Sequence, residues 1–191
     1  MLILVAGILL FLGAHVFTTL RTARDGLITR LGPGPYKGLH SLVSLVGFGL
    51  IIYGFGQYRA GGLIPVWTPP VWARHVTLPL MWLAFVSLGA MGPTPGLIRG
   101  LLRHPMLVAI KIWALAHLLV NGDAGGMLLF GSFLAFAVYD RISVKRRGDP
   151  GAPRHPGLGV GDGIALGVGT LAYVGMVIGH RWIIGVSVFG G

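Results

Sequence analysis

The chain contains no cysteine and no glutamate among its 191 residues. The lack of cysteine excludes disulfide bonds, thiolate zinc sites, iron–sulfur clusters and a haem ligated by cysteine. The lack of glutamate leaves five aspartates as the acidic side chains of the sequence. Carboxylate-based acid–base chemistry is therefore limited to few candidate residues.

Charged side chains are also scarce, at 10% of residues, against about 25% in a soluble domain. With 54% hydrophobic residues and several apolar runs long enough to cross a bilayer, the composition predicts an integral membrane protein. The 33 glycines fit the close helix packing found in lipid. We find no nucleic-acid-binding motif, so we attribute the net charge of +10 to membrane topology.

The apolar runs predict an all-α, polytopic membrane helix bundle with about six transmembrane helices, in a single domain covering residues 1–191. The first run lacks a positively charged N-terminal region, so we expect a retained helix rather than a signal peptide. The predicted helices cover approximately residues 2–20, 39–57, 76–91, 103–123, 124–139 and 160–178.

The segments between these runs carry turn and interface signals. Gly32-Pro33-Gly34-Pro35 is expected to break any helix, and Asn121-Gly122-Asp123 is expected to form a tight turn. Two tryptophans lie between prolines in residues 58–74, which predicts an ordered interfacial loop. Residues 140–154 are expected to form a basic, solvated loop, and residues 183–189 to lie along the membrane interface.

The distribution of basic residues predicts the orientation in the membrane. One side of the predicted bundle carries eleven of them. The opposite side carries three, which are Arg59, Arg74 and Arg181. Because basic residues collect in cytoplasmic loops, six spans would place both termini on the non-cytoplasmic side. The eleven are Arg21, Arg24, Arg30, Lys37, Arg99, Arg103, Arg141, Lys145, Arg146, Arg147 and Arg154.

Two of the seven histidines, His15 and His117, lie inside predicted membrane helices. Imidazole is a common haem-iron ligand, and two imidazoles from separate helices can hold one haem from both faces. The alternative is that each hydrogen-bonds a neighbouring helix. The two would lie at one depth if the first helix continued to Arg30, because each would then be about 20 Å from the basic side.

The remaining histidines lie at helix ends or in loops. His40 and His104 begin two predicted helices on the cytoplasmic side and form a rival pair; the alternative for His104, which precedes Pro105, is that it only caps a helix. His75 and His180 are expected to meet lipid headgroups on the outer side. His155 is expected to be exposed in the polar loop.

Two further residues in the apolar runs, Lys111 and Trp113, could serve a cofactor. Lys111 requires an anion, such as an aspartate, a haem propionate or a lipid phosphate, unless it extends its ammonium to the interface. Trp113 could form one wall of a flat cofactor site or simply pack in the core. Asp140 and Arg141 are expected to form an interfacial ion pair.

Long motifs throughout the chain closely resemble the NnrU family. The motifs are R-H-P-M-L (103–107), K-I-W-A-L-A-H-L-L-V-N-G-D (111–123), L-L-F-G-S-F-L-A-F-A-V-Y-D-R-I-S-V-K-R-R (128–147), Y-K-G-L-H-S-L-V-S-L-V-G-F (36–48) and V-W-T-P-P-V-W-A-R-H (66–75). The same superfamily includes the plant and cyanobacterial 15-cis-zeta-carotene isomerases. These share a histidine in the first helix and the R-H-P…A-H pattern, which is kept here as His104 and His117.

The resemblance implies a haem b protein of the bacterial inner membrane. The carotene isomerases ligate haem through two histidines at positions matching His15 and His117. The resemblance therefore favours these two as iron ligands, with Lys111, Trp113 and His104 as further candidate cofactor-binding residues and no catalytic residue assigned. Relatives often carry an aromatic residue at the position of His40, so the pair of His40 with His104 gains no support.

Three functions are consistent with this resemblance. The first is a redox-regulated, isomerase-like enzyme acting on a small or hydrophobic substrate. The second is an electron-transfer or nitric-oxide-responsive accessory protein, because NnrU proteins are associated with nitrite and nitric oxide reduction; denitrification components would then be partners. The third is a structural protein without a cofactor. The R-H-P element also resembles one in isoprenylcysteine-type membrane methyltransferases, a lesser alternative because the C-terminal half here is poor in acids.

Overall fold

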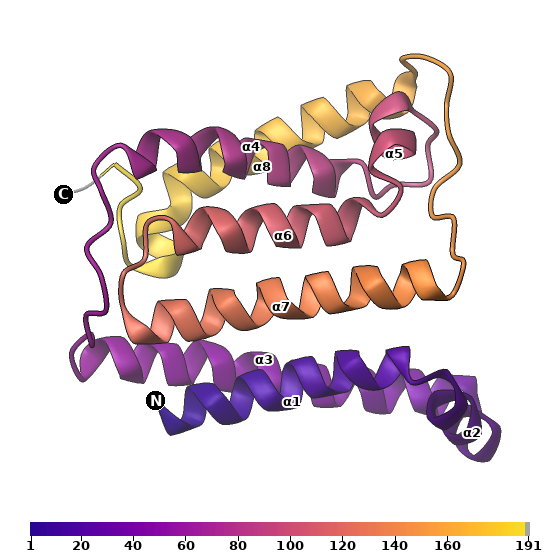
Figure 1. The fold of residues 1–191 in the computed structure, drawn as a ribbon, viewed down its shortest axis with the longest axis horizontal. Coiled ribbons are helices and arrows are strands. Elements are labelled where there is room, and N and C mark those ends of the chain that lie inside the picture. The colour runs from indigo at the N-terminus through magenta and orange to yellow at the C-terminus, as the bar shows by residue number, and fades with distance from the viewer. Residues whose placement is uncertain (190–191) are drawn as a thin grey trace. The chain divides into compact units, whose positions relative to one another are not determined.

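The computed structural model describes residues 1–189, and the regular secondary structure of this part is helical, apart from an isolated bridge between Pro65 and Asp123 (Figure 1). Two of the eight helices in this described part are short segments at membrane-helix ends, α2 and α5. The helices are α1 (Leu2–Thr19), α2 (Arg21–Leu31), α3 (Pro33–Ala60), α4 (Ala73–Gly89), α5 (Leu97–Leu102), α6 (Pro105–Leu118), α7 (Ala124–Arg146) and α8 (Val160–Ile184).

Four of these helices, α1, α3, α7 and α8, are long and apolar enough to cross a membrane. The 14-residue α6 is apolar but spans only about 21 Å, short of a hydrocarbon core of about 30 Å. The 17-residue α4 contains Pro79. The all-α membrane class is therefore confirmed, whereas the count of six spans stays a prediction.

Packing divides the chain into two compact units, each formed from two separate segments. The first unit comprises Met1–Pro70 and His117–Arg147, and it contains α1, α2, α3 and α7. The second unit comprises Val71–Ala116 and the chain from Gly148 onward, and it contains α4, α5, α8 and nearly all of α6.

Glycines hold α1 and α3 of the first unit in close antiparallel contact (Figure 1). A Cβ atom on Gly7 would lie 2.6 Å from the amide nitrogen of Ile51. A Cβ atom on Gly47 would lie 2.7 Å from that of Phe11. These positions therefore require glycine, as expected where small residues let two helix backbones approach in lipid.

The loop before α4 and the turn before α7 are tied together in the first unit. The amides of Val66 and Trp67 both donate to the carbonyl of Gly122, at 2.8 and 3.0 Å. Asp123 caps α7, because its carboxylate accepts from the amide of Gly126 at 2.8 Å. The hydrogen-bonded turn between α6 and α7 falls on Leu119 and Val120, just before the predicted Asn121-Gly122-Asp123 segment, which is extended and leads into the cap of α7.

The second unit contains two helices, α4 and α8, that pack through small residues. A Cβ atom on Gly169 would lie 2.6 Å from the Cα of Val86. The indole of Trp82 donates to the hydroxyl of Thr170 at 3.0 Å, which adds a polar contact between the same two helices. The predicted solvated loop after α7 instead packs on this unit: the amide of Ala152 donates to the carbonyl of Arg103 at 2.7 Å.

Several predicted helix boundaries were wrong. The first helix ends at Thr19, close to the predicted residue 20, but the separate helix α2 that follows the bend at Leu20 (φ −81°, ψ 77°) was not predicted. Pro33 lies inside the start of α3 rather than in a break, since a proline needs no amide hydrogen in a first helical turn. The helix predicted to end at Tyr139 continues to Arg146, and the one predicted for residues 103–123 covers only Pro105–Leu118.

Candidate functional site

His15 lies one turn before the end of α1 and has a defined ring orientation. Its Nδ1 donates to the carbonyl of Phe11 at 2.7 Å. Because a carbonyl can only accept, this bond fixes the proton of the neutral imidazole on Nδ1 and leaves the Nε2 lone pair available. The ring also lies 4.3 Å from the ring of Phe11 and 5.9 Å from that of Phe136, measured between centroids. His15 is therefore oriented as a metal-ligating histidine usually is.

His40 of α3 is the imidazole that the structure brings next to His15. The two ring centroids are 5.3 Å apart and the ring planes meet at 64°. The Nε2 atom of His40 is buried without a hydrogen-bond partner, as are the hydroxyls of Tyr36 and Ser44. These three residues recur every four positions and so form one stripe along α3. Buried polar atoms normally have partners, so this stripe suggests that a further group belongs there.

His117 lies at a different level of the first unit. It is the penultimate residue of α6, and its ring stacks on that of Phe130 with centroids 4.5 Å apart. His15 contacts Phe136, which lies six residues further along α7. Six residues correspond to about 9 Å of helix rise. Since α1 ends at Thr19, the continuation that would have aligned the two histidines does not occur.

The other three candidate cofactor-binding residues, His104, Lys111 and Trp113, belong to the second unit. The carbonyl of His104 accepts from the amide of Val108 at 3.2 Å, which is a helix-capping contact at the start of α6. Lys111 is half-buried in α6. Trp113 lines an apolar cavity of about 230 Å³ with Met81 and Phe85.

A second feature of the first unit is a basic cavity of about 460 Å³. It lies where α1 and α7 end and α2 and α3 begin, so its walls come from four helices. Its ionisable lining residues are Arg21, Arg24, Lys37, Arg147, His40 and Asp140. Its hydroxyl-bearing lining residues are Thr18, Thr19, Tyr36 and Ser41.

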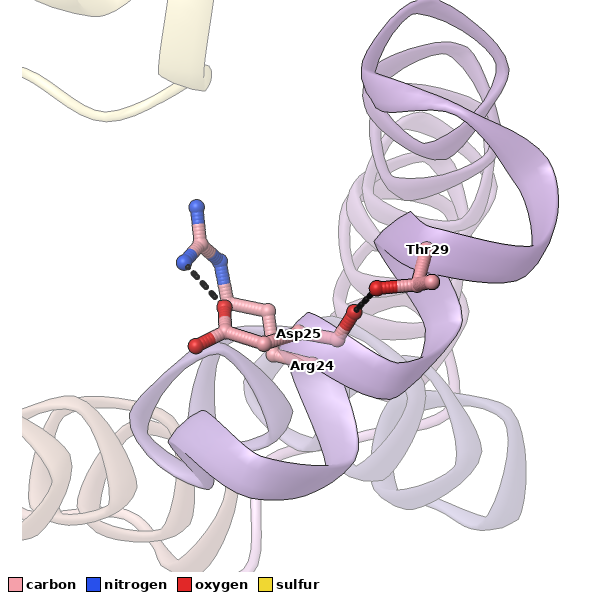
Figure 2. Close-up of polar contacts among 3 residues, drawn as sticks. All are labelled: Arg24, Asp25 and Thr29. Carbon is pink, nitrogen blue, oxygen red and sulfur yellow. Dashed lines mark hydrogen bonds and ion pairs between the residues drawn. The ribbon is translucent and has the colours of Figure 1, made fainter.

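Ion pairing accounts for little of this charge. Among the described residues, Arg24 forms an ion pair with Asp25, with 3.1 Å between the guanidinium nitrogen and the carboxylate oxygen. Figure 2 shows this contact on α2, where the hydroxyl of Thr29 also donates to the carbonyl of Asp25. The expected pair of Asp140 with Arg141 is not formed. Asp140 instead lines the basic cavity.

The sequence analysis missed both the proximity of His15 to His40 and the cavity. The sequence signal that could have revealed the imidazole pair is the recurrence of Tyr36, His40 and Ser44 at intervals of four residues, which marks one face of a helix. It was overlooked because the helix was predicted to begin at residue 39, which places Tyr36 outside it. The arginines and the lysine that line the cavity had been interpreted only as indicators of membrane topology.

Among the described residues, no three histidine or aspartate side chains lie close enough together to hold a metal ion. A haem iron makes a smaller demand on the protein, because the macrocycle fills four positions and one or two imidazoles suffice. The oriented Nε2 of His15 and the buried, unpartnered Nε2 of His40 supply donors of this kind. The donor chemistry of the first unit thus fits a haem.

Comparison with known proteins gives one match. The family described as NnrU protein matches residues 3–188, which is nearly the whole chain. None of the curated proteins matches the chain. None of the solved structures matches it either.

Proposed function

Because the chain belongs to the NnrU family and carries an oriented imidazole inside its first membrane helix, we propose that the protein binds haem b with His15 as an axial ligand of the iron. The observation that carries the proposal is the 2.7 Å hydrogen bond from Nδ1 of His15 to the carbonyl of Phe11. That bond presents Nε2 as a ligand and raises its basicity.

Two residues compete as the second axial ligand. Family resemblance favours His117, whose ring stacks on Phe130. Geometry favours His40, whose Nε2 is buried without a partner and whose ring is 5.3 Å from that of His15. A bound haem would supply an iron that changes oxidation state and exchanges an axial ligand. The protein's part is to orient His15 and to supply the apolar surface of Phe11 and Phe136 beside it.

Absorption spectroscopy of the detergent-purified protein from haem-replete cells tests the proposal. We expect a Soret band and a pyridine haemochrome of the b type. The variant His15→Ala should lose most of its haem, and the variant that loses haem among His40→Ala and His117→Ala identifies the second ligand. His75→Ala is the matched control, because this exposed histidine lies outside the first unit. Colourless protein, or full haem content in His15→Ala, would contradict the proposal.

The same material separates an isomerase-like enzyme from an electron carrier. Binding of carbon monoxide by the reduced protein would indicate an axial ligand that leaves the iron, as an isomerase-like or gas-responsive function requires. A reduced spectrum unchanged by carbon monoxide would indicate two retained ligands and would favour electron transfer in support of nitrite or nitric oxide reduction. In either case we propose location in the bacterial inner membrane.

A further inference from the structure

The basic cavity of the first unit has the properties of an anion site. Four basic side chains line it, Arg21, Arg24, Lys37 and Arg147, against the single carboxylate of Asp140. Two of the four are already engaged: Arg24 pairs with Asp25, and Arg147 donates to the hydroxyl of Ser143 at 2.6 Å. Arg21 and Lys37 are exposed, and no carboxylate of the described residues pairs with either. The cavity therefore carries an excess of positive charge.

A buried hydroxyl strengthens this interpretation. Tyr36 lines the cavity and is only 7% exposed, and its hydroxyl is buried without a hydrogen-bond partner. The guanidinium of Arg24 lies 5.8 Å from the centroid of the Tyr36 ring, so the aromatic face is covered by a cation. A buried donor without an acceptor is unfavourable and is rare in folded proteins. An anion in the cavity would supply the acceptor.

The arrangement favours a phosphate over a carboxylate. A phosphate group offers three oxygens and more than one negative charge, so it can engage several guanidinium and ammonium groups with a hydroxyl at once. The cavity volume of about 460 Å³ is large enough for such a group together with a short polar headgroup. The lining residues lie at the ends of membrane-length helices, where phospholipid headgroups are found.

We propose that this cavity binds a phosphate group, carried either by an anionic phospholipid headgroup or by a free phosphate. Arg21 and Lys37 neutralise its charge, Arg24 covers the Tyr36 ring, and the Tyr36 hydroxyl donates to one oxygen. The proposed phosphate site does not depend on haem, because His40 is the one lining residue of the cavity that is also a candidate haem ligand. Loss of haem from His15→Ala should therefore leave phosphate binding intact.

Binding can be measured as the rise in the unfolding midpoint of the full chain in detergent. One arm adds inorganic phosphate and a second adds short-chain phosphatidylglycerol, with short-chain phosphatidylcholine and acetate as reference ligands. A rise with inorganic phosphate identifies a soluble anion. A rise with phosphatidylglycerol but not with inorganic phosphate identifies a lipid headgroup. Equal rises with acetate, or no rise in either arm, would overturn the proposal.

Two variants test the named residues. The double variant Arg21→Gln/Lys37→Gln should bind at least tenfold more weakly than the parent. The matched control is Arg30→Gln/Lys145→Gln, which removes the same two charge types from exposed positions near the same helix ends that do not line the cavity. Equal weakening in both variants would show nonspecific charge attraction and would overturn the site.

Tyr36→Phe provides a readout that does not depend on net charge. Because the hydroxyl has no partner in the protein itself, its removal should not lower the unfolding midpoint without ligand. It should reduce the ligand-induced rise several-fold. A lowered midpoint without ligand, together with an unchanged ligand-induced rise, would show that the hydroxyl has a structural role and takes no part in phosphate binding.

Discussion

The imidazole rings of His15 and His40 lie 5.3 Å apart at an angle of 64°, and they join α1 to α3 near the basic end of the first unit. Two such groups inside membrane-length helices are costly unless each has a partner. His15 has one in the carbonyl of Phe11, whereas Nε2 of His40 has none. His40 is therefore the residue whose substitution best separates a structural role from a ligand role.

We expect His40→Leu to raise the stability of the haem-free protein by about 1 kcal/mol, because a buried polar atom without a partner is replaced by an apolar group of similar size. Thermal unfolding of haem-free protein in detergent measures this change. If His40 is an axial ligand, the same variant should lose haem when it is produced in haem-replete cells. A marked destabilisation without haem would show that the contact of the His40 ring with the Ala14 backbone outweighs the cost of its unpartnered Nε2 atom.

The contact between α1 and α3 makes a second prediction. Gly47→Ala should destabilise the protein by about 1–3 kcal/mol, because the added Cβ would lie 2.7 Å from the amide nitrogen of Phe11 and the helices must separate. Gly49→Ala, two residues away on the same helix, has no atom within 4 Å of the added Cβ and should be neutral or slightly stabilising. Equal effects of the two substitutions on the unfolding midpoint would refute the proposed packing.

Local signals explain what the sequence predicted well. Long apolar runs predicted the all-helical membrane class, and the residues Asn121, Gly122 and Asp123 marked the connection between α6 and α7. The end of the first helix near residue 20 was predicted, whereas α2 was not, because its polar, arginine-rich sequence contains no apolar run. Pro33 caused the start of the next helix to be predicted too late, at residue 39. A proline breaks a helix interior but is compatible with the first helical turn, where α3 has it.

The candidate site was less predictable because it depends on contacts between distant segments. His15 and His40 are separated by 25 positions, and their proximity follows from how α1 packs on α3. The pair of His15 with His117 was favoured by the family resemblance, and its equal depth in the membrane required a first helix that continues to Arg30, which does not occur. Asp162 was not singled out at all, because two of its three hydrogen-bond partners, Leu97 and Ile98, lie more than sixty positions away.

Asp162 makes a third prediction. It is 3% exposed, and its carboxylate accepts from the amides of Leu97, Ile98 and Gly159 at 2.7–2.9 Å. It thus caps α5 and α8 of the second unit together. Asp162→Ala should lower stability by about 2 kcal/mol, since it leaves three part-buried amide donors without a charged acceptor.

The control for this variant is Asp25→Ala. The Asp25 side chain is 63% exposed and forms a surface ion pair with Arg24 (Figure 2). Exposed pairs contribute less than about 1 kcal/mol, so this substitution should have little effect. Similar unfolding midpoints for the two variants would show that the Asp162 contacts contribute no more than a surface pair does.

The absence of cysteine allows a direct test of membrane orientation, because any introduced cysteine is the single thiol in the protein. We place one at Thr22, an exposed position of α2 close to the basic cavity, and another at Thr68, an exposed position in the loop that precedes α4. The excess of basic residues near α2 predicts that this end faces the cytoplasm. A membrane-impermeant maleimide should therefore label Thr68→Cys in intact spheroplasts, whereas Thr22→Cys should react only after permeabilisation. Labelling in the reverse pattern would show that charge distribution does not set the orientation, and it would place the basic cavity on the outer surface.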